Sequence, residues 1–170
     1  MYVPNFKQLF ILLFVALFFI SCGTSRKVSQ KTETHKTGTK STNKKKESII
    51  KYVKTFKGTR YQFGGTTKKG MDCSGLVFVA FKKENISLPR VSRDMATRGK
   101  SISLSKTTKG DLLFFKTNKN KKNINHVGLV IEKKGSDILF IHSTSSRGVI
   151  ISSLNEKYWK NAFVSVRRIL

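Results

Sequence analysis

Hydrophobic residues follow three successive patterns along this chain, and each pattern predicts a different kind of segment. Residues 9–20 are apolar without interruption. Between residues 49 and 56 the apolar positions recur at a spacing that places them on one face of a helix, with Ser48 as its N-cap. Beyond residue 110 the period becomes two, which is typical of strands. The chain is therefore predicted to contain an apolar leader, then helices, then antiparallel strands.

The region after Ser48 contains further helix and strand signals. Residues 76–81 are apolar throughout, and we place them in a buried helix that begins near Cys73, although their β-branched content also suits a strand. A short polar helix is expected from Ser92. Strands are expected at 111–115, 126–132, 138–142, 149–152 and 163–168. Ser153 and Glu156 are spaced as a capping box that opens a short helix to Trp159. This order predicts an α+β fold, with helices first and an antiparallel meander second.

The apolar run is an export signal rather than part of the fold. It is twelve residues long and follows the positive Lys7, whereas a membrane span needs about 20 residues. It ends at small residues around Cys22, so residues 1–21 resemble a bacterial lipoprotein signal, in which Cys22 would be lipidated. A plain signal peptide and an uncleaved anchor stay open, because the tetrapeptide FISC departs from the usual pattern at two positions.

Composition separates a basic tether from a folded domain. Residues 22–47 contain eight Lys or Arg and two Glu, and we expect them to form a flexible tether in which His35 has no role. Residues 48–170 are expected to form one domain. The whole chain carries 34 Lys and Arg against 9 Asp and Glu, a net charge of +25. Such a charge indicates that the protein works near a polyanion, which could be nucleic acid, anionic lipid or an acidic wall polymer. The predicted export signal argues against nucleic acid.

Three residues outside the tether have side chains suited to nucleophilic chemistry: Cys73, His126 and His142. If Cys22 carries lipid, Cys73 has no disulfide partner. At a helix start, free N–H groups and the helix dipole would favour its thiolate. A turn centred on Lys134 would place the two histidines directly opposite each other on one face of a hairpin, so that one imidazole orients the other. A register slip by an odd number would separate them.

Two other interpretations of these residues stay open. A buried cysteine more often acts as a small apolar residue than as a nucleophile. Two histidines across a hairpin are also half of a metal site, but zinc usually takes three or four protein ligands. We therefore expect no metal and no other cofactor.

The stretch GTRYQFGGTTKKGMDCSGLVFVAF around Cys73 resembles the nucleophile segment of the NlpC/P60 family of cell-wall cysteine peptidases. The resemblance continues in the family's order through LPR, KGDLLFF, NHVG and FIH to GV and YW. It covers nearly all of residues 48–170. It implies a papain-like fold, in which a helix with the nucleophile packs on an antiparallel sheet that bears the base.

The resemblance also implies roles for single residues. Cys73 corresponds to the nucleophile, His126 to the general base and His142 to the residue that orients the base.

Three further positions match residues expected around the substrate. Tyr61 is expected near the oxyanion, beside the Cys73 backbone N–H. Asp72 and Ser74 match positions that line the substrate groove, although Asp72 equally suits a helix N-cap.

A peptidoglycan stem peptide is the substrate that this resemblance implies, most often at the γ-D-Glu–diamino acid bond. Some members instead cut the D-Ala–diaminopimelate crosslink, and a non-catalytic cell-wall-binding lipoprotein of the same fold is a further alternative. A transferase of the wider superfamily is disfavoured, because there the His precedes the Cys. We expect a monomer that contacts peptidoglycan and no nucleic acid. Its N-terminal lipid would anchor it to a membrane, and Gly23 favours the outer membrane facing the periplasm.

Overall fold

The computed structural model describes residues 34–118 and 123–170, which belong to one compact unit, Thr34–Leu170. The predictions for the signal peptide and for Cys22 lie outside the described residues. The helices are α2 (Thr34–Lys54), α3 (Cys73–Lys82), α4 (Ser92–Met95), the 3-10 turn η1 (Leu104–Lys106) and α5 (Lys157–Ala162). The strands are β1 (Thr66–Thr67), β2 (Gly70–Met71), β3 (Lys100–Ile102), β4 (Leu112–Phe115), β5 (His126–Lys134), β6 (Asp137–Thr144), β7 (Gly148–Ser153) and β8 (Phe163–Arg168). Within the described ranges, no helix has the length and apolar character needed to cross a membrane.

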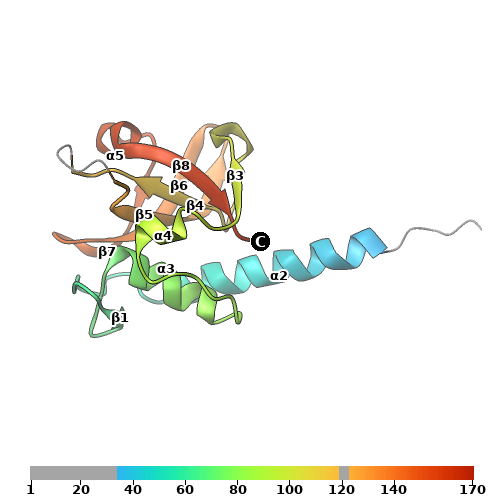
Figure 1. The fold of residues 1–170 in the computed structure, drawn as a ribbon, viewed down its shortest axis with the longest axis horizontal. Helices are drawn as coiled ribbons and strands as arrows, with labels where there is room; N and C mark the ends of the chain where they lie inside the picture. Colours follow the sequence, from blue (N-terminus) through green and yellow to red (C-terminus); the bar gives the residue numbers. More distant parts are fainter. Residues whose placement is uncertain (1–33, 119–122) are drawn as a thin grey trace, which may run out of the picture. The chain divides into compact units, whose positions relative to one another are not determined.

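Six strands form one antiparallel sheet in the order β3-β8-β4-β5-β6-β7, with α2 and α3 on one side of it (Figure 1). The predicted α+β class, the helix from Cys73, the short helix from Ser92 and all five predicted strands are confirmed. The sequence analysis missed β3, which pairs with β8 and extends the sheet at its edge.

Alternate residues of the central strand β4 point into two separate hydrophobic cores. Leu112 and Phe114 pack with residues of α2 and α3, whereas Leu113 and Phe115 pack with Trp159 of α5. A strand covered on both faces reads as an unbroken apolar run, as β4 does. The sheet therefore holds α3, which begins at Cys73, on one face and α5 on the other.

The N-terminal end of α2 was predicted wrongly. Ser48 is not an N-cap: it lies inside the helix, and its hydroxyl donates to the Glu84 carboxylate. The helix continues back to Thr34, through residues that we assigned to a flexible tether. The apolar residues at 49–53 pack into the core and nucleate the helix. Residues before them extend it toward Thr34 by adding backbone hydrogen bonds, and this extension does not require that their side chains be buried. Glu47 adds an ion pair to Lys109 at 3.3 Å.

The capping box before α5 was predicted only in part. The Glu156 carboxylate accepts the Ser153 N–H at 2.8 Å, as such a box requires. The Ser153 hydroxyl donates to the Asp137 carboxylate and accepts the Asn155 N–H at 3.0 Å, whereas a capping box would have it accept the Glu156 N–H. The helix itself begins later, at Lys157.

Candidate active site

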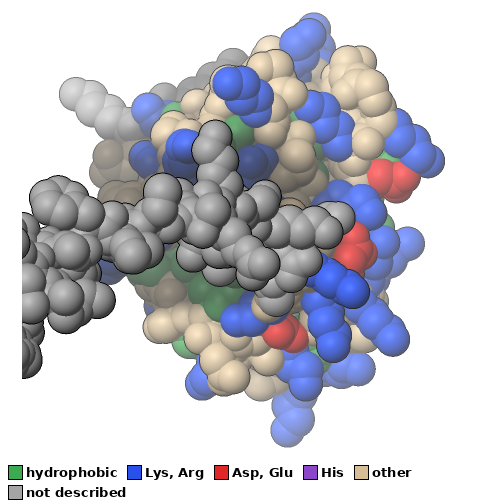
Figure 2. Space-filling model, turned by 90° about the vertical axis from the view of Figure 1, so that its right-hand side faces the viewer, with side chains coloured by type: hydrophobic (Ala, Val, Ile, Leu, Met, Phe, Trp, Pro, Cys, Tyr) green, Lys and Arg blue, Asp and Glu red, His purple; other side chains and the backbone are tan. Residues whose placement is uncertain are grey.

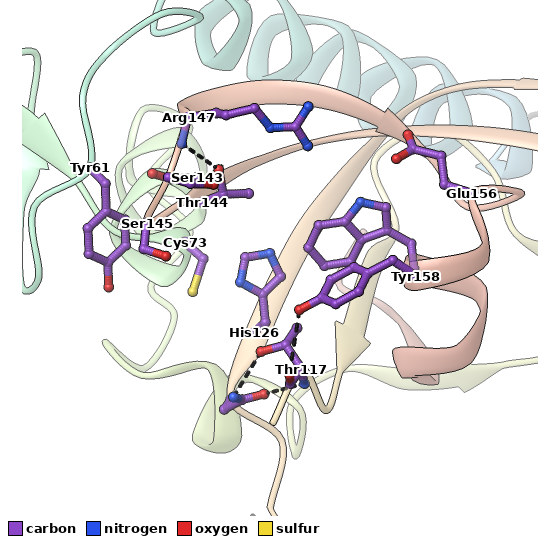
Figure 3. A pocket seen from close by; sticks show the side chains of 13 residues that line it. Tyr61, Cys73, Thr117, His126, Ser143, Thr144, Ser145, Arg147, Glu156 and Tyr158 are labelled. Carbon is purple, nitrogen blue, oxygen red and sulfur yellow. Dashed lines mark hydrogen bonds between the residues drawn. The ribbon is translucent and has the colours of Figure 1, made fainter. Parts of the chain in front are cut away.

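Cys73 is the first residue of α3, and its neighbour Asp72 caps that helix. The Asp72 carboxylate accepts the Gly75 N–H at 2.6 Å, which satisfies one of the N–H groups that a helix start leaves unpaired. Helix α3 contacts β5 and β6. This packing brings the largely buried thiol to the wall of a pocket of about 400 Å³ that His126 also lines (Figure 3).

His126 and His142 are in direct hydrogen-bond contact. Nε2 of His126 lies 2.9 Å from Nδ1 of His142, and Nε2 of His142 lies 3.1 Å from the hydroxyl of Ser152. Because His126 uses Nε2 in this way, its Nδ1 is the ring nitrogen left for Cys73. The backbone N–H of Val127, the residue next to His126, acts on the Cys73 sulfur and lowers the pKa of the thiol, against the larger effect of burial. Figure 3 shows the sulfur and the His126 ring beside each other in the pocket.

The predicted pairing of β5 with β6 is wrong. We placed His126 directly opposite His142, with the turn centred on Lys134. In the structure Lys134 pairs with Asp137, and the turn between them contains Gly135 at a positive φ of 58°. If that register continued along both strands, the two histidines would point to opposite faces of the hairpin.

A β-bulge at Ile131 corrects the register by one residue. Beyond it Leu129 pairs with Ile141, so His126 and His142 become diagonal neighbours on one face. The contact that we predicted therefore exists, but the bulge creates it.

Burial favours the uncharged forms of Cys73, His126 and His142. It lowers the pKa of His126 from 6.5 to about 4. The pKa of His142 falls to about 2, chiefly through burial and then through the charges of His126 and Arg147. Burial also raises the pKa of the Cys73 thiol, and this outweighs the backbone N–H groups around the sulfur. Of the two resting states that the residues allow, a thiolate beside an imidazolium and a neutral thiol beside a neutral imidazole, these pKa shifts favour the neutral pair.

Aromatic rings enclose the histidine pair and cause this desolvation. Trp159 stacks on His126 with ring centroids 5.2 Å apart and an angle of 24° between the planes. The Trp159 and His142 ring centroids are 4.5 Å apart, with the two planes at 80°. The Phe140 and His142 ring centroids are 4.6 Å apart. Trp159 is 5% exposed and lines the pocket. Trp159 therefore belongs both to the core and to the wall of the site.

Tyr61 lines the same pocket as Cys73. Burial raises the pKa of its hydroxyl, and the charges of Cys73 and Asp72 raise it further. The hydroxyl therefore stays protonated at neutral pH and can donate a hydrogen bond into the pocket.

Asp72 and Ser74 do not line the pocket; they belong to a buried network around Arg90. The Arg90 guanidinium donates to both Asp72 oxygens, at 3.0 and 2.9 Å, and to the Ser74 hydroxyl at 3.0 Å. Burial by itself would raise the pKa of Asp72, but the bonds from Arg90 and from the Gly75 N–H hold it below its usual range. The N-cap role of Asp72 is confirmed, and both side chains have a structural role in this network, whereas their contact with substrate stays a prediction.

Replacing Arg90 with methionine should lower the free energy of unfolding by about 2 kcal/mol. The Asp72 side chain is only 10% exposed and would lose its ion pair. The expected loss of stability stays near the low end for a buried pair, because the Arg90 side chain is one-third exposed to solvent. Urea unfolding at pH 7 measures the change.

Arg93→Met is the matched control, because it breaks an exposed ion pair with Asp94. We expect this control to lose less than about 1 kcal/mol. Equal losses in the two variants would contradict a structural role for the Asp72 network.

The sequence analysis missed three residues of this site: Arg90, Arg147 and Ser152. The LPR triplet signalled Arg90 without its role, and nothing around Ser152 or Arg147 marks either residue before the strands are paired. Within residues 34–118 and 123–170, no three His, Cys, Asp or Glu side chains lie close enough together to hold a metal ion.

Comparisons with known proteins agree with this geometry. The NlpC/P60 family model matches residues 58–168. The murein DD-endopeptidase MepS/murein LD-carboxypeptidase of Escherichia coli K12 is 40% identical over 126 residues, which are 74% of this chain and 63% of that protein. A probable endopeptidase NlpC homolog of Haemophilus influenzae is 42% identical over 114 residues, which are 66% of this chain and 57% of that protein. The chain thus spans less than two thirds of the length of either relative.

A solved structure of an NlpC/P60 family protein from Bacillus cereus superposes with a TM-score of 0.67 at 31% identity. The superposition covers 74% of this chain and 40% of that one.

Proposed function

This chain belongs to the NlpC/P60 family, and we propose on that premise that it is a peptidoglycan hydrolase that cleaves stem peptides with Cys73 as nucleophile. The observation that carries the proposal is the shared pocket of Cys73 and His126, with His142 bound behind His126 at 2.9 Å. A nucleophile, a base and a group that orients the base are the parts that thiol acyl transfer requires.

The first chemical step starts from neutral groups. As the Cys73 sulfur attacks the peptide carbonyl, its proton moves to Nδ1 of His126. The imidazolium so formed is stabilised by the hydrogen bond from its Nε2 to His142. The Cys73 N–H and the Tyr61 hydroxyl donate to the oxyanion, and such a donor contributes about 3 kcal/mol in comparable sites.

The acyl-enzyme then forms and breaks down with the same groups. His126 gives its proton to the leaving amine, which leaves a thioester on Cys73. Water, with its proton taken by His126, hydrolyses the thioester and restores the thiol.

The charge of the pocket and of the surface supports a substrate rich in carboxylates. Arg147 lines the pocket, is exposed, and makes no ion pair with another described residue. Figure 2 shows Lys and Arg side chains spread over one face of the molecule, with few Asp or Glu among them. Such a field raises the local concentration of anionic substrates and speeds their association.

For the scissile bond, we propose the γ-D-Glu–diamino acid bond, with the D-Ala–diaminopimelate crosslink as the alternative. The name of the E. coli relative, a murein DD-endopeptidase, favours the alternative. Digestion of a muropeptide mixture by the full chain, read by mass spectrometry, separates the two bonds by the masses of the products. If a folded wild-type protein releases no product, the hydrolase proposal fails and a non-catalytic wall-binding role gains support.

Lipid attachment at Cys22 and an outer-membrane position facing the periplasm are also part of this proposal. They are supported by the apolar run at 9–20 and the small residues around Cys22. Growth with an alkyne-tagged fatty acid should label the wild-type chain and Cys73→Ala, but not Cys22→Ser. A label that survives in Cys22→Ser would rule out lipid at this residue.

A further inference from the structure

The hydrogen-bond chain behind the nucleophile continues one residue beyond the histidine pair. The Ser152 hydroxyl, on β7, lies 3.1 Å from Nε2 of His142. His142 pairs with Ile150 across the sheet, so Ser152 is its diagonal neighbour on the same face. Ser152 is only 4% exposed, and it is the hydrogen-bond partner of that nitrogen within the described part of the chain.

A neutral imidazole has one donor nitrogen and one acceptor nitrogen, so two proton arrangements satisfy the bond between His126 and His142. In the first arrangement His126 carries its proton on Nε2, and Nδ1 is free to accept the proton of Cys73. His142 then accepts at Nδ1 and carries its own proton on Nε2, which needs an acceptor. In the second arrangement the Nδ1 proton of His126 points at the sulfur, and His126 cannot act as a base.

The reaction itself requires the first arrangement. Once His126 has taken the thiol proton, both of its nitrogens are donors, and Nε2–H needs an acceptor. His142 is that acceptor only while its proton is on Nε2. The Ser152 oxygen is the acceptor in place for that proton, and a buried donor without an acceptor is costly.

We propose that Ser152 is a positioning residue: its hydroxyl oxygen accepts the Nε2 proton of His142 and so holds His126 in the tautomer that deprotonates Cys73. The catalytic reading of this inference rests on the proposed function, but the reactivity of the thiol tests it separately. In Ser-His-Asp hydrolases, an orienting group that imposes the wrong tautomer lowers turnover by about 10⁴-fold, so this kind of effect is large.

Other charged and titratable groups face the histidine pair or line the same pocket, and the variants below leave all of them in place. They are Cys73 at the start of α3, Tyr61 in the loop before β1, Arg147 between β6 and β7, and Glu156 and Tyr158 at α5. Asp72 lies outside the pocket, and its charge acts on Cys73, whose pKa it raises.

Substitutions at Ser152 separate the hydroxyl from the shape of the side chain. Ser152→Thr keeps the oxygen, and Ser152→Val has nearly the same shape without it, so any crowding affects both variants equally. Ser152→Ala removes the hydroxyl without adding bulk. Ser152→Asp supplies a stronger acceptor. Thermal unfolding of each full-length variant checks that it folds.

The measurement is the rate at which iodoacetamide alkylates Cys73, followed from pH 3 to 9 in the full chain and read at the Cys73 peptide by mass spectrometry. Near neutral pH, Ser152→Val and Ser152→Ala should react about tenfold more slowly than Ser152→Thr and the wild type. Ser152→Asp should stabilise the His126 imidazolium, and so should move the acid limb of the profile to higher pH. The kcat/KM for muropeptides should follow the same order.

A merely structural role would lower the folded fraction and leave the acid limb where it is. The proposal is overturned if Cys73 is alkylated equally fast in Ser152→Val and Ser152→Thr. It is also overturned if Ser152→Asp does not move the acid limb of the alkylation profile. If neither β-branched variant folds, the comparison of Ala and Asp with the wild type decides in the same way. If alkylation follows the expected order but the wild type cleaves no muropeptide, the relay stands and the hydrolase function falls.

Discussion

Cys73→Ala is expected to lower stem-peptide hydrolysis by about 10⁵-fold, the largest effect of any single substitution in this chain. The variant has no atom that can form the acyl-enzyme, so only binding and the oxyanion donors remain. Single-turnover digestion of purified muropeptides, read by mass spectrometry, measures the loss. Cys73→Ser should also be nearly inactive, because a hydroxyl gives up its proton to a neutral imidazole far less readily than a thiol does.

Lys82→Gln provides the control for this experiment. Lys82 ends the same helix, roughly 13 Å from Cys73 along the helix axis, and its exposed side chain lies over the Phe78 ring. It should retain wild-type turnover, and the alanine variant should retain the wild-type unfolding curve. Substantial hydrolysis by a folded Cys73→Ala protein would sink the thiol mechanism.

His126→Ala is expected to have the second-largest effect, a loss of about 10⁴-fold in kcat/KM, because the neutral thiol then has no base. The wild-type pH profile provides a further check. The pKa of His126 is lowered to about 4. The base is therefore present at neutral pH and is lost only as the pH falls through about 4, so the acid limb should lie well below the ordinary histidine pKa of 6.5.

His142→Ala separates the two histidines. It leaves His126 in place but removes the acceptor at its Nε2, so a small residual activity should persist. Equal losses in His126→Ala and His142→Ala would assign the base role to the pair rather than to His126. An acid limb near pH 6.5 would contradict the buried, neutral imidazole.

Features that depend on neighbouring residues in the sequence could be predicted from it. Helix α3 begins at Cys73 because Asp72 caps it and the apolar run behind it is long enough for a helix. The five strands were found because alternation with period two is a local signal. The family motifs identified Cys73, His126 and His142 as the residues to examine.

Features that depend on the pairing register between strands could not be predicted from the sequence. The turn at Gly135 by itself sets a register that would separate His126 from His142. The bulge at Ile131 shifts the register by one residue and so brings the two histidines to the same face. No residue type in the strand signals a bulge. The Ser152 hydroxyl becomes part of the site only through the pairing of β6 with β7.

Electrostatics is the other property that the sequence misjudged, because the cost of burying a charge depends on what surrounds it. Helix-start geometry predicts a thiolate at Cys73, but desolvation raises the pKa of the thiol instead. The sequence marks Asp72 as a helix N-cap or a groove residue, but it does not show that Arg90, 18 residues away, binds both of its oxygens.

Local patterns along the chain thus determined most of the elements, since capping and periodicity act between neighbours, and the motifs marked the three side chains that carry the proposed chemistry. The protonation of those side chains, their contact across β5 and β6, and the serine behind them were decided by folding. Register and burial are properties of the packed sheet, and only long-range contacts create them.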